Sequence, residues 1–113
     1  MSQEVTLEDL VELFGVEPDL QPESWYEGAA FQIERAGESL LIDLRPNSNY
    51  ILCRWCRDSS VLVDIVFIGY ESLAVERHKG QEHLFVRLPA GSYLVIQVAP
   101  EFKVSVRGQL LAP

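Results

Sequence analysis

The sequence predicts an all-β protein, an antiparallel β-sandwich or jelly roll of about eight strands that follows one short α-helix. Three observations carry this prediction. Short apolar runs alternate with turn residues from residue 31 to residue 111, at spacings of roughly 8 to 12 residues. Several of these runs alternate apolar and polar side chains, as half-buried strands do. No helical stretch separates the runs, so nothing predicts the crossover helices that a parallel sheet needs.

Residues 6–15 predict the helix, which is amphipathic and about two turns long. Thr6 is placed to cap its N-terminus, and Gly15 is placed to end it. A helix this short is marginal alone, so its apolar face must pack on something. Two roles stay open, a cap over an open end of the sandwich or a docking helix for a partner. The apolar face consists of Leu7, Leu10, Val11 and Phe14, of which Leu7, Leu10 and Phe14 are candidate interface residues.

The strands follow in order. Residues 31–34 and 40–45 predict a hairpin around the turn at residues 36–38, and residues 50–57 predict a further strand. Residues 61–68 are apolar on both faces except at Asp64, which predicts a central strand. The remaining strands are predicted at residues 73–78, 83–88, 93–99 and 102–106.

Length and composition predict one domain. The chain has 113 residues, of which 48% are apolar, enough for one core and too few for two. We divide it into an acidic N-terminal helix and linker (residues 1–28) and a β-sandwich (residues 29–113). The sequence shows neither a signal peptide nor a membrane helix, so a cytoplasmic protein without a membrane partner is expected.

The net charge of −8 is unevenly distributed. Residues 1–38 contain ten acidic residues and a single basic one, Arg35, whereas the other 75 residues contain seven acidic and eight basic residues. An acidic surface repels phosphate backbones, so no direct binding to nucleic acid is expected. The acidic segment is interpreted either as an aid to solubility or as a contact for a basic partner.

Three segments resemble the prepeptidase C-terminal domains and their jelly-roll relatives, which are appended to secreted bacterial enzymes. Residues 31–40 look like the opening hairpin of that family, residues 63–67 like its aspartate-containing central strand, and residues 88–95 like its penultimate turn and strand. The resemblance implies a sandwich without catalysis of its own. Calcium binding is not carried over, because Asp64 is a single carboxylate where calcium takes six to eight oxygen ligands.

Two cysteines and two histidines have the residue types and spacings of a tetrahedral zinc site. They are Cys53, Cys56, His78 and His83. However, residues three apart on an extended strand point to opposite faces and lie roughly 10 Å apart, which separates the two thiols. The alternative is a pair of cysteines that act as small apolar residues. The same separation argues against a disulfide between them.

The sequence contains no phosphate loop, serine elbow or His-Glu metal helix, so we expect no enzyme activity and no cofactor. Three apolar side chains, Phe85, Tyr93 and Val95, fall outside the inward-facing set of their strands and predict an interface. The leading hypothesis is a non-catalytic module that binds another protein or forms a homodimer. The alternatives are a small acidic inhibitor or immunity-type protein that acts on a basic partner, and a structural zinc-binding sandwich.

Overall fold

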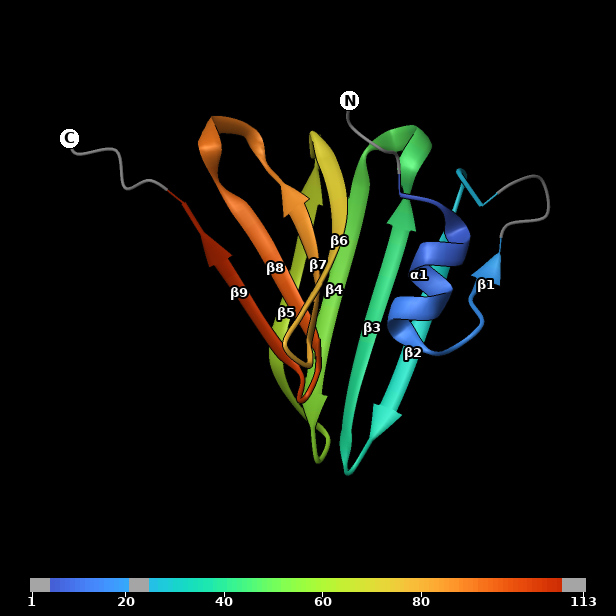
Figure 1. Ribbon diagram of the computed structural model, residues 1–113, viewed down its shortest axis with the longest axis vertical. Coiled ribbons are helices and arrows are strands. Elements are labelled where there is room, and N and C mark those ends of the chain that lie inside the picture. The colour runs from blue at the N-terminus through green and yellow to red at the C-terminus, as the bar shows by residue number, and fades with distance from the viewer. Residues whose placement is uncertain (1–4, 21–24, 109–113) are drawn as a thin grey trace.

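The computed structural model describes residues 5–20 and 25–108 (Figure 1). In this part of the chain, nine strands form two antiparallel sheets, and one helix lies beside them. The first sheet has the order β1-β2-β3-β4-β5, and the second has the order β6-β7-β8-β9. The structure therefore confirms the predicted all-β sandwich with a short N-terminal helix.

The bounds of the elements follow the predicted segments closely. The helix α1 spans Leu7–Phe14. The first sheet comprises β1 (Asp19–Leu20), β2 (Ala29–Arg35), β3 (Glu38–Arg45), β4 (Tyr50–Arg57) and β5 (Ser60–Ile68). The second comprises β6 (Ser72–His78), β7 (Gln81–Arg87), β8 (Tyr93–Ala99) and β9 (Lys103–Arg107). Single 3-10 turns at Pro46–Ser48 and Pro89–Gly91 join β3 to β4 and β7 to β8.

Each sheet is a meander in which consecutive strands are neighbours. Of the two predicted forms this is the plain sandwich, since a jelly roll contains Greek-key connections. Three of the hairpins turn through two residues that both have positive φ, the geometry that a tight turn between twisted strands favours. These residue pairs are Ala36 with Gly37, Asp58 with Ser59, and Lys79 with Gly80.

The core lies between the sheets and is built from alternate residues of the strands. In β2 the side chains at positions 31 and 33 are buried, as are those at 40, 42 and 44 in β3, and the residues between them are more exposed. Strands β4 and β7 contribute in the same way, whereas β8 is buried on both faces from Leu94 to Val98. Fully buried large side chains include Phe31, Leu40, Ile42, Leu44, Ile51, Leu84, Leu94 and Ile96.

The helix α1 covers one side of the sandwich. The Thr6 hydroxyl accepts a hydrogen bond from the backbone N–H of Asp9, and the Asp9 carboxylate accepts one from the N–H of Thr6. This reciprocal cap fixes the start of the helix. Its end is fixed by Gly15, which has a φ of 72°. No helix in the described residues is long and apolar enough to cross a membrane.

Strand β5 corrects one prediction. Its continuous apolar sequence predicts a central strand, but it forms the edge of the first sheet. On the face turned away from the core, Val66 and Ile68 are 46% and 75% exposed. The apolar pattern indicates burial on both faces, but it does not reveal whether a second neighbouring strand is present.

Candidate protein-interaction surfaces

The structure does not bring the four candidate zinc ligands together. Cys53 and Cys56 lie on β4 in the first sheet, whereas His78 and His83 lie on β6 and β7 in the second. Cys53 is buried in the core, and Nε2 of His83 is 3.2 Å from Oε1 of Gln97. No group of three or more His, Cys, Asp or Glu side chains in the described residues has an arrangement that could hold a metal ion. The spacing within the cysteine pair and within the histidine pair suggested a zinc site. However, a complete strand, β5, lies between the two pairs along the chain, and they belong to different sheets.

Cys53 occupies an apolar position rather than a reactive one. Burial, together with the negative charge of Asp64, raises the pKa of its thiol to about 12. A thiol is nucleophilic and binds metal in its deprotonated form, which this environment disfavours. Cys53 therefore acts as a small core residue, as the alternative interpretation expected of both cysteines, whereas Cys56 is only half-buried.

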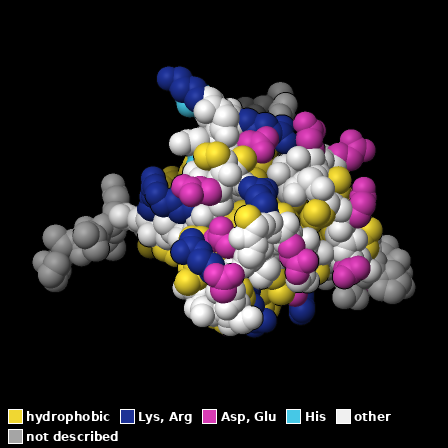
Figure 2. Space-filling view, turned by 90° about the horizontal axis from the view of Figure 1, so that it is seen from below, with side chains coloured by type: hydrophobic (Ala, Val, Ile, Leu, Met, Phe, Trp, Pro, Cys, Tyr) yellow, Lys and Arg dark blue, Asp and Glu magenta, His cyan; other side chains and the backbone are white. Residues whose placement is uncertain are grey.

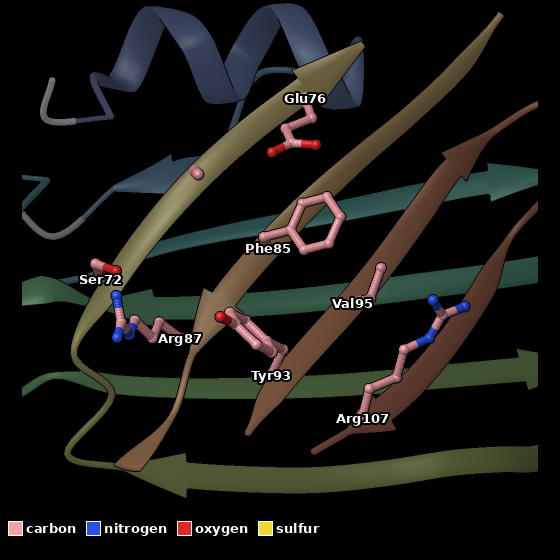
Figure 3. Close-up of a pocket in the computed structure, with 8 residues that line it drawn as sticks. Ser72, Glu76, Phe85, Arg87, Tyr93, Val95 and Arg107 are labelled. Atoms are coloured by element: carbon pink, nitrogen blue, oxygen red, sulfur yellow. The ribbon is translucent and has the colours of Figure 1, made fainter. Parts of the chain in front are cut away.

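The predicted interface residues Phe85, Tyr93 and Val95 lie together on the outer face of the second sheet (Figure 3). Strand pairing sets Phe85 of β7 opposite Val95 of β8. Tyr93 is 40% exposed, whereas Val95 is only 6% exposed even though it does not belong to the core cluster. These side chains line a shallow groove of about 470 Å³.

Charged side chains border this groove (Figure 3). Arg87 lies at one end, with its Nε 3.5 Å from a carboxylate oxygen of Glu71, and Arg107 of β9 lies at the other. Glu76 of β6 is also part of the rim. Aromatic and arginine side chains are enriched where proteins bind one another, so this groove is one candidate surface.

The structure corrects the interface prediction for the helix. Leu10 is fully buried and Phe14 is 4% exposed, and both belong to the protein's own core. The rings of Phe14 and Phe31 of β2 lie 4.8 Å apart, and α1 also contacts β6 and β7. Leu13, which does not belong to the predicted apolar face, is buried as well, and Leu7 is half-buried. The helix therefore caps the sandwich, and its apolar face is not available for a partner.

The polar face of α1 and the chain that follows it form a second candidate surface, which we call the acidic flank. It consists of six exposed carboxylates, those of Glu8, Asp9, Glu12, Glu17, Asp19 and Glu27. Seen from the lower end of Figure 1, acidic side chains gather toward the side of α1 and β1, and basic ones lie more toward the opposite side (Figure 2). Glu4 and Glu23, two of the ten acidic residues between residues 1 and 38, lie outside the described residues.

Few basic groups neutralise the acidic flank. Glu12 lies 3.5 Å from Nη1 of Arg77, but both side chains are exposed, so the pair is screened by solvent. Hydrogen bonds from the backbone and side chain of Thr6 lower the pKa of Asp9, so this carboxylate stays ionised. The flank is therefore a concentrated negative surface at neutral pH.

An aromatic pair immediately precedes Glu27 of the acidic flank in the sequence. The rings of Trp25 and Tyr26 are 4.6 Å apart, and Tyr26 is 44% exposed. Together with Val5, which immediately precedes the helix cap, they line a depression of about 560 Å³. Aromatic side chains next to charged ones supply the apolar contact area that protein interfaces use.

Six charged residues of the first sheet form ion pairs at the surface. Arg54 of β4 pairs with Asp64 of β5 at 3.4 Å, and Arg45 pairs with Asp43 within β3 at 3.2 Å. Arg57 lies 3.3 Å from Glu38. These are ordinary surface pairs of the kind expected on a solvated sheet face, and each contributes little to stability.

Sequence reasoning missed the third candidate surface, the exposed apolar edge at β5. Its outward-facing residues were assigned to a buried strand, because an edge strand and a central strand can have the same composition. The signal that distinguishes them is the number of neighbouring strands, which only the fold supplies.

No family model and no curated protein matches the sequence. Among solved structures, the fold is similar to a chain of a contact-dependent growth inhibition toxin–immunity protein complex from Klebsiella pneumoniae 342. The TM-score is 0.80 at 12% sequence identity, and the alignment covers 94% of this chain and 96% of that chain. At this identity the match shows a shared fold over almost the whole length of both chains. The resemblance to prepeptidase C-terminal domains stays a prediction.

Proposed function

We propose that this protein is a non-catalytic inhibitor of the immunity type, which binds a basic protein partner and blocks the partner's activity. The match to a chain of the toxin–immunity protein complex carries the proposal, because it extends over 94% of this chain. The proposal takes up the alternative that the sequence offered, a small acidic protein directed at a basic partner. It retains the predicted cytoplasmic location.

Charge supports the immunity role. A protein with a net charge of −8 attracts a basic partner over long distances, which raises the rate of association. The carboxylates are also concentrated on one flank, so the attraction has a direction. A partner whose basic surface normally binds a polyanion would be blocked by this flank.

We assign the contact to the acidic flank, with Trp25 and Tyr26 as its apolar anchor. The flank has six exposed carboxylates, and among the described residues one of them, Glu12, forms a weak ion pair, with Arg77. Its carboxylates are held on α1 and on the chain that follows, and α1 is fixed to the core through Leu10 and Phe14. A surface fixed in this way loses little conformational entropy on binding.

Neutralising three of these carboxylates tests the assignment. Glu8, Glu17 and Glu27 are exposed and form no hydrogen bond or ion pair among the described residues. The triple variant Glu8→Gln, Glu17→Gln, Glu27→Gln should bind the partner at least about tenfold more weakly at low salt, because three exposed charges are lost. The partner is captured on the immobilised protein from its own cells, identified by mass spectrometry and purified for calorimetry.

The matched control removes the same charge elsewhere. Glu34, Glu76 and Glu101 are also exposed, and the variant Glu34→Gln, Glu76→Gln, Glu101→Gln has the same net charge as the test variant. We expect this control to bind almost as tightly as the wild type. If the control loses affinity and the flank variant does not, the contact lies outside the flank, and the assignment to the flank is wrong.

A further inference from the structure

The free edge of the first sheet is unusually apolar for an edge strand. Residues 63–68 of β5 contain one charged side chain, Asp64, and β5 has no neighbour beyond β4 within the described residues. Natural proteins usually protect such edges with lysine, proline or inward-pointing charges, because unpaired N–H and C=O groups attract another strand. Asp64 points outward and is already paired with Arg54, so it does not protect the edge.

The core is also incompletely covered along β5. The inward-facing residues of β5 are Val63, Ile65 and Phe67, and all three are only half-buried. In contrast, Cys53 and Ile51 of β4, which pair with Ile65 and Phe67, are fully buried. On the opposite side, α1 covers the sandwich. The side at β5 has no comparable cover within the described residues, and both faces of the strand leave apolar area in water.

We propose that this edge binds a second copy of the same chain, with β5 paired antiparallel to β5 across a two-fold axis. The two five-stranded sheets then join into one sheet of ten strands. The proposal is independent of the inhibitor function, since it uses the opposite edge of the sheet from β1 and the acidic flank.

The sequence of β5 can pair with itself without setting like charges opposite each other, and we propose the register centred on Ile65. With the two-fold axis at Ile65, Asp64 lies opposite Val66 of the second copy and Val63 lies opposite Phe67 of the second copy. No cross-strand pair in this register contains two charged residues. The charged residue in the centre of the strand, Asp64, already forms an ion pair with Arg54 of its own chain. An axis at Asp64 would instead set two carboxylates opposite each other, which is unfavourable.

Charge distribution favours a second copy at this edge. Two chains that each have a net charge of −8 repel one another when their acidic surfaces meet. The acidic flank lies on the side of α1 and β1, whereas β5 forms the other edge of the sheet (Figure 1). Pairing through β5 therefore keeps the two acidic flanks at the outer ends of the dimer, where both remain accessible.

The mass of the full-length protein in solution tests the proposal. Light scattering after size-exclusion chromatography should give twice the chain mass of 12.8 kDa for the wild type. The variant Val66→Asp should elute with the mass of one chain, because it sets a carboxylate opposite Asp64 of the second copy. Val66→Lys should remain a dimer, since its ammonium group would face that same carboxylate. Only the proposed register predicts that Val66→Asp separates the dimer while Val66→Lys leaves it intact.

Val106→Asp is the matched control. Val106 lies on β9, at the edge of the second sheet, and is 54% exposed, similar to Val66. It should leave the dimer intact. A wild type with the mass of one chain over roughly a hundredfold range of concentration would overturn the proposal, and so would a dimer that survives Val66→Asp.

Hydrogen exchange of the wild type provides a readout that does not depend on a folded variant. Amide groups of β5 that face the free edge should exchange more slowly as the protein concentration rises. Exchange from β5 that does not depend on concentration would contradict the dimer.

Discussion

Cys53 illustrates how a single residue type can suggest chemistry that its surroundings prevent. Its spacing from Cys56 is that of a metal-binding pair, but β4 directs Cys53 into the core between Ile42 and Ile65 of the neighbouring strands. Because side chains alternate between the two faces of a strand, the sequence alone predicted that the two thiols point to opposite faces. The burial that raises the pKa of Cys53 depends on packing between sheets, which spacing does not reveal.

The raised pKa of Cys53 predicts a loss of stability at alkaline pH. The unfolded chain loses this proton near the ordinary thiol pKa of 9.0, whereas the folded protein keeps it up to about 12. Between these values the folded state binds more protons, so the free energy of unfolding should fall as the pH rises, by roughly 1 kcal/mol per pH unit. Burial also raises the pKa of Tyr70, which acts in the same direction.

Urea denaturation at a series of pH values measures this effect. Cys53→Ala should reduce the slope above pH 9, leaving the part that Tyr70 contributes, whereas Cys56→Ala should keep the wild-type slope. Equal slopes for the wild type and Cys53→Ala would show that Cys53 is not protected from ionisation.

At the scale of elements, the sequence predicted the position and the ends of the helix correctly. Its role became clear only from how the helix packs on the sheets. Thr6 and Gly15 mark its ends in the sequence, and both form the expected caps. Its apolar face is equally consistent with a core contact and with a docking surface. The structure distinguishes them because Leu10 and Phe14 belong to one buried cluster with residues of both sheets.

Two leucine variants test the packing of the helix. Leu10 is fully buried in the core, whereas Leu20 of β1 is 49% exposed. Leu10→Ala should lower the free energy of unfolding by about 2–5 kcal/mol, because it removes buried methyl groups and leaves a cavity. Leu20→Ala removes the same atoms from the surface and should change it by less than about 0.5 kcal/mol. Similar losses for both variants in urea denaturation would mean that α1 does not rest on the core.

The strands were predictable as elements because their turns are encoded locally. Ala36-Gly37 and Lys79-Gly80 interrupt apolar alternation at the points where tight hairpins turn. Strand β5 was located correctly along the chain, but its place in the sheet was not. That place depends on which strands pair, and the pairing is set by contacts across the whole fold.

At the scale of the whole molecule, charge and apolar surface are separated. The acidic flank lies on the side of α1, the aromatic groove lies on the outer face of the second sheet, and the apolar edge lies at β5. The sequence predicted the acidic segment and the grouping of Phe85, Tyr93 and Val95, because both follow from local composition or alternation. It did not predict the exposed edge, which exists only once the sheets are assembled.

Growth of cells that produce the partner tests the inhibitor function most directly. Expression of the partner alone should stop growth, and co-expression of the wild-type protein should restore it. The Glu8→Gln, Glu17→Gln, Glu27→Gln variant should restore growth poorly at an equal level of folded protein, because the acidic flank has lost half of its six carboxylates. The Glu34→Gln, Glu76→Gln, Glu101→Gln control should protect as the wild type does. A partner that is harmless when expressed alone, or one whose toxicity persists with the wild-type protein, would contradict the account.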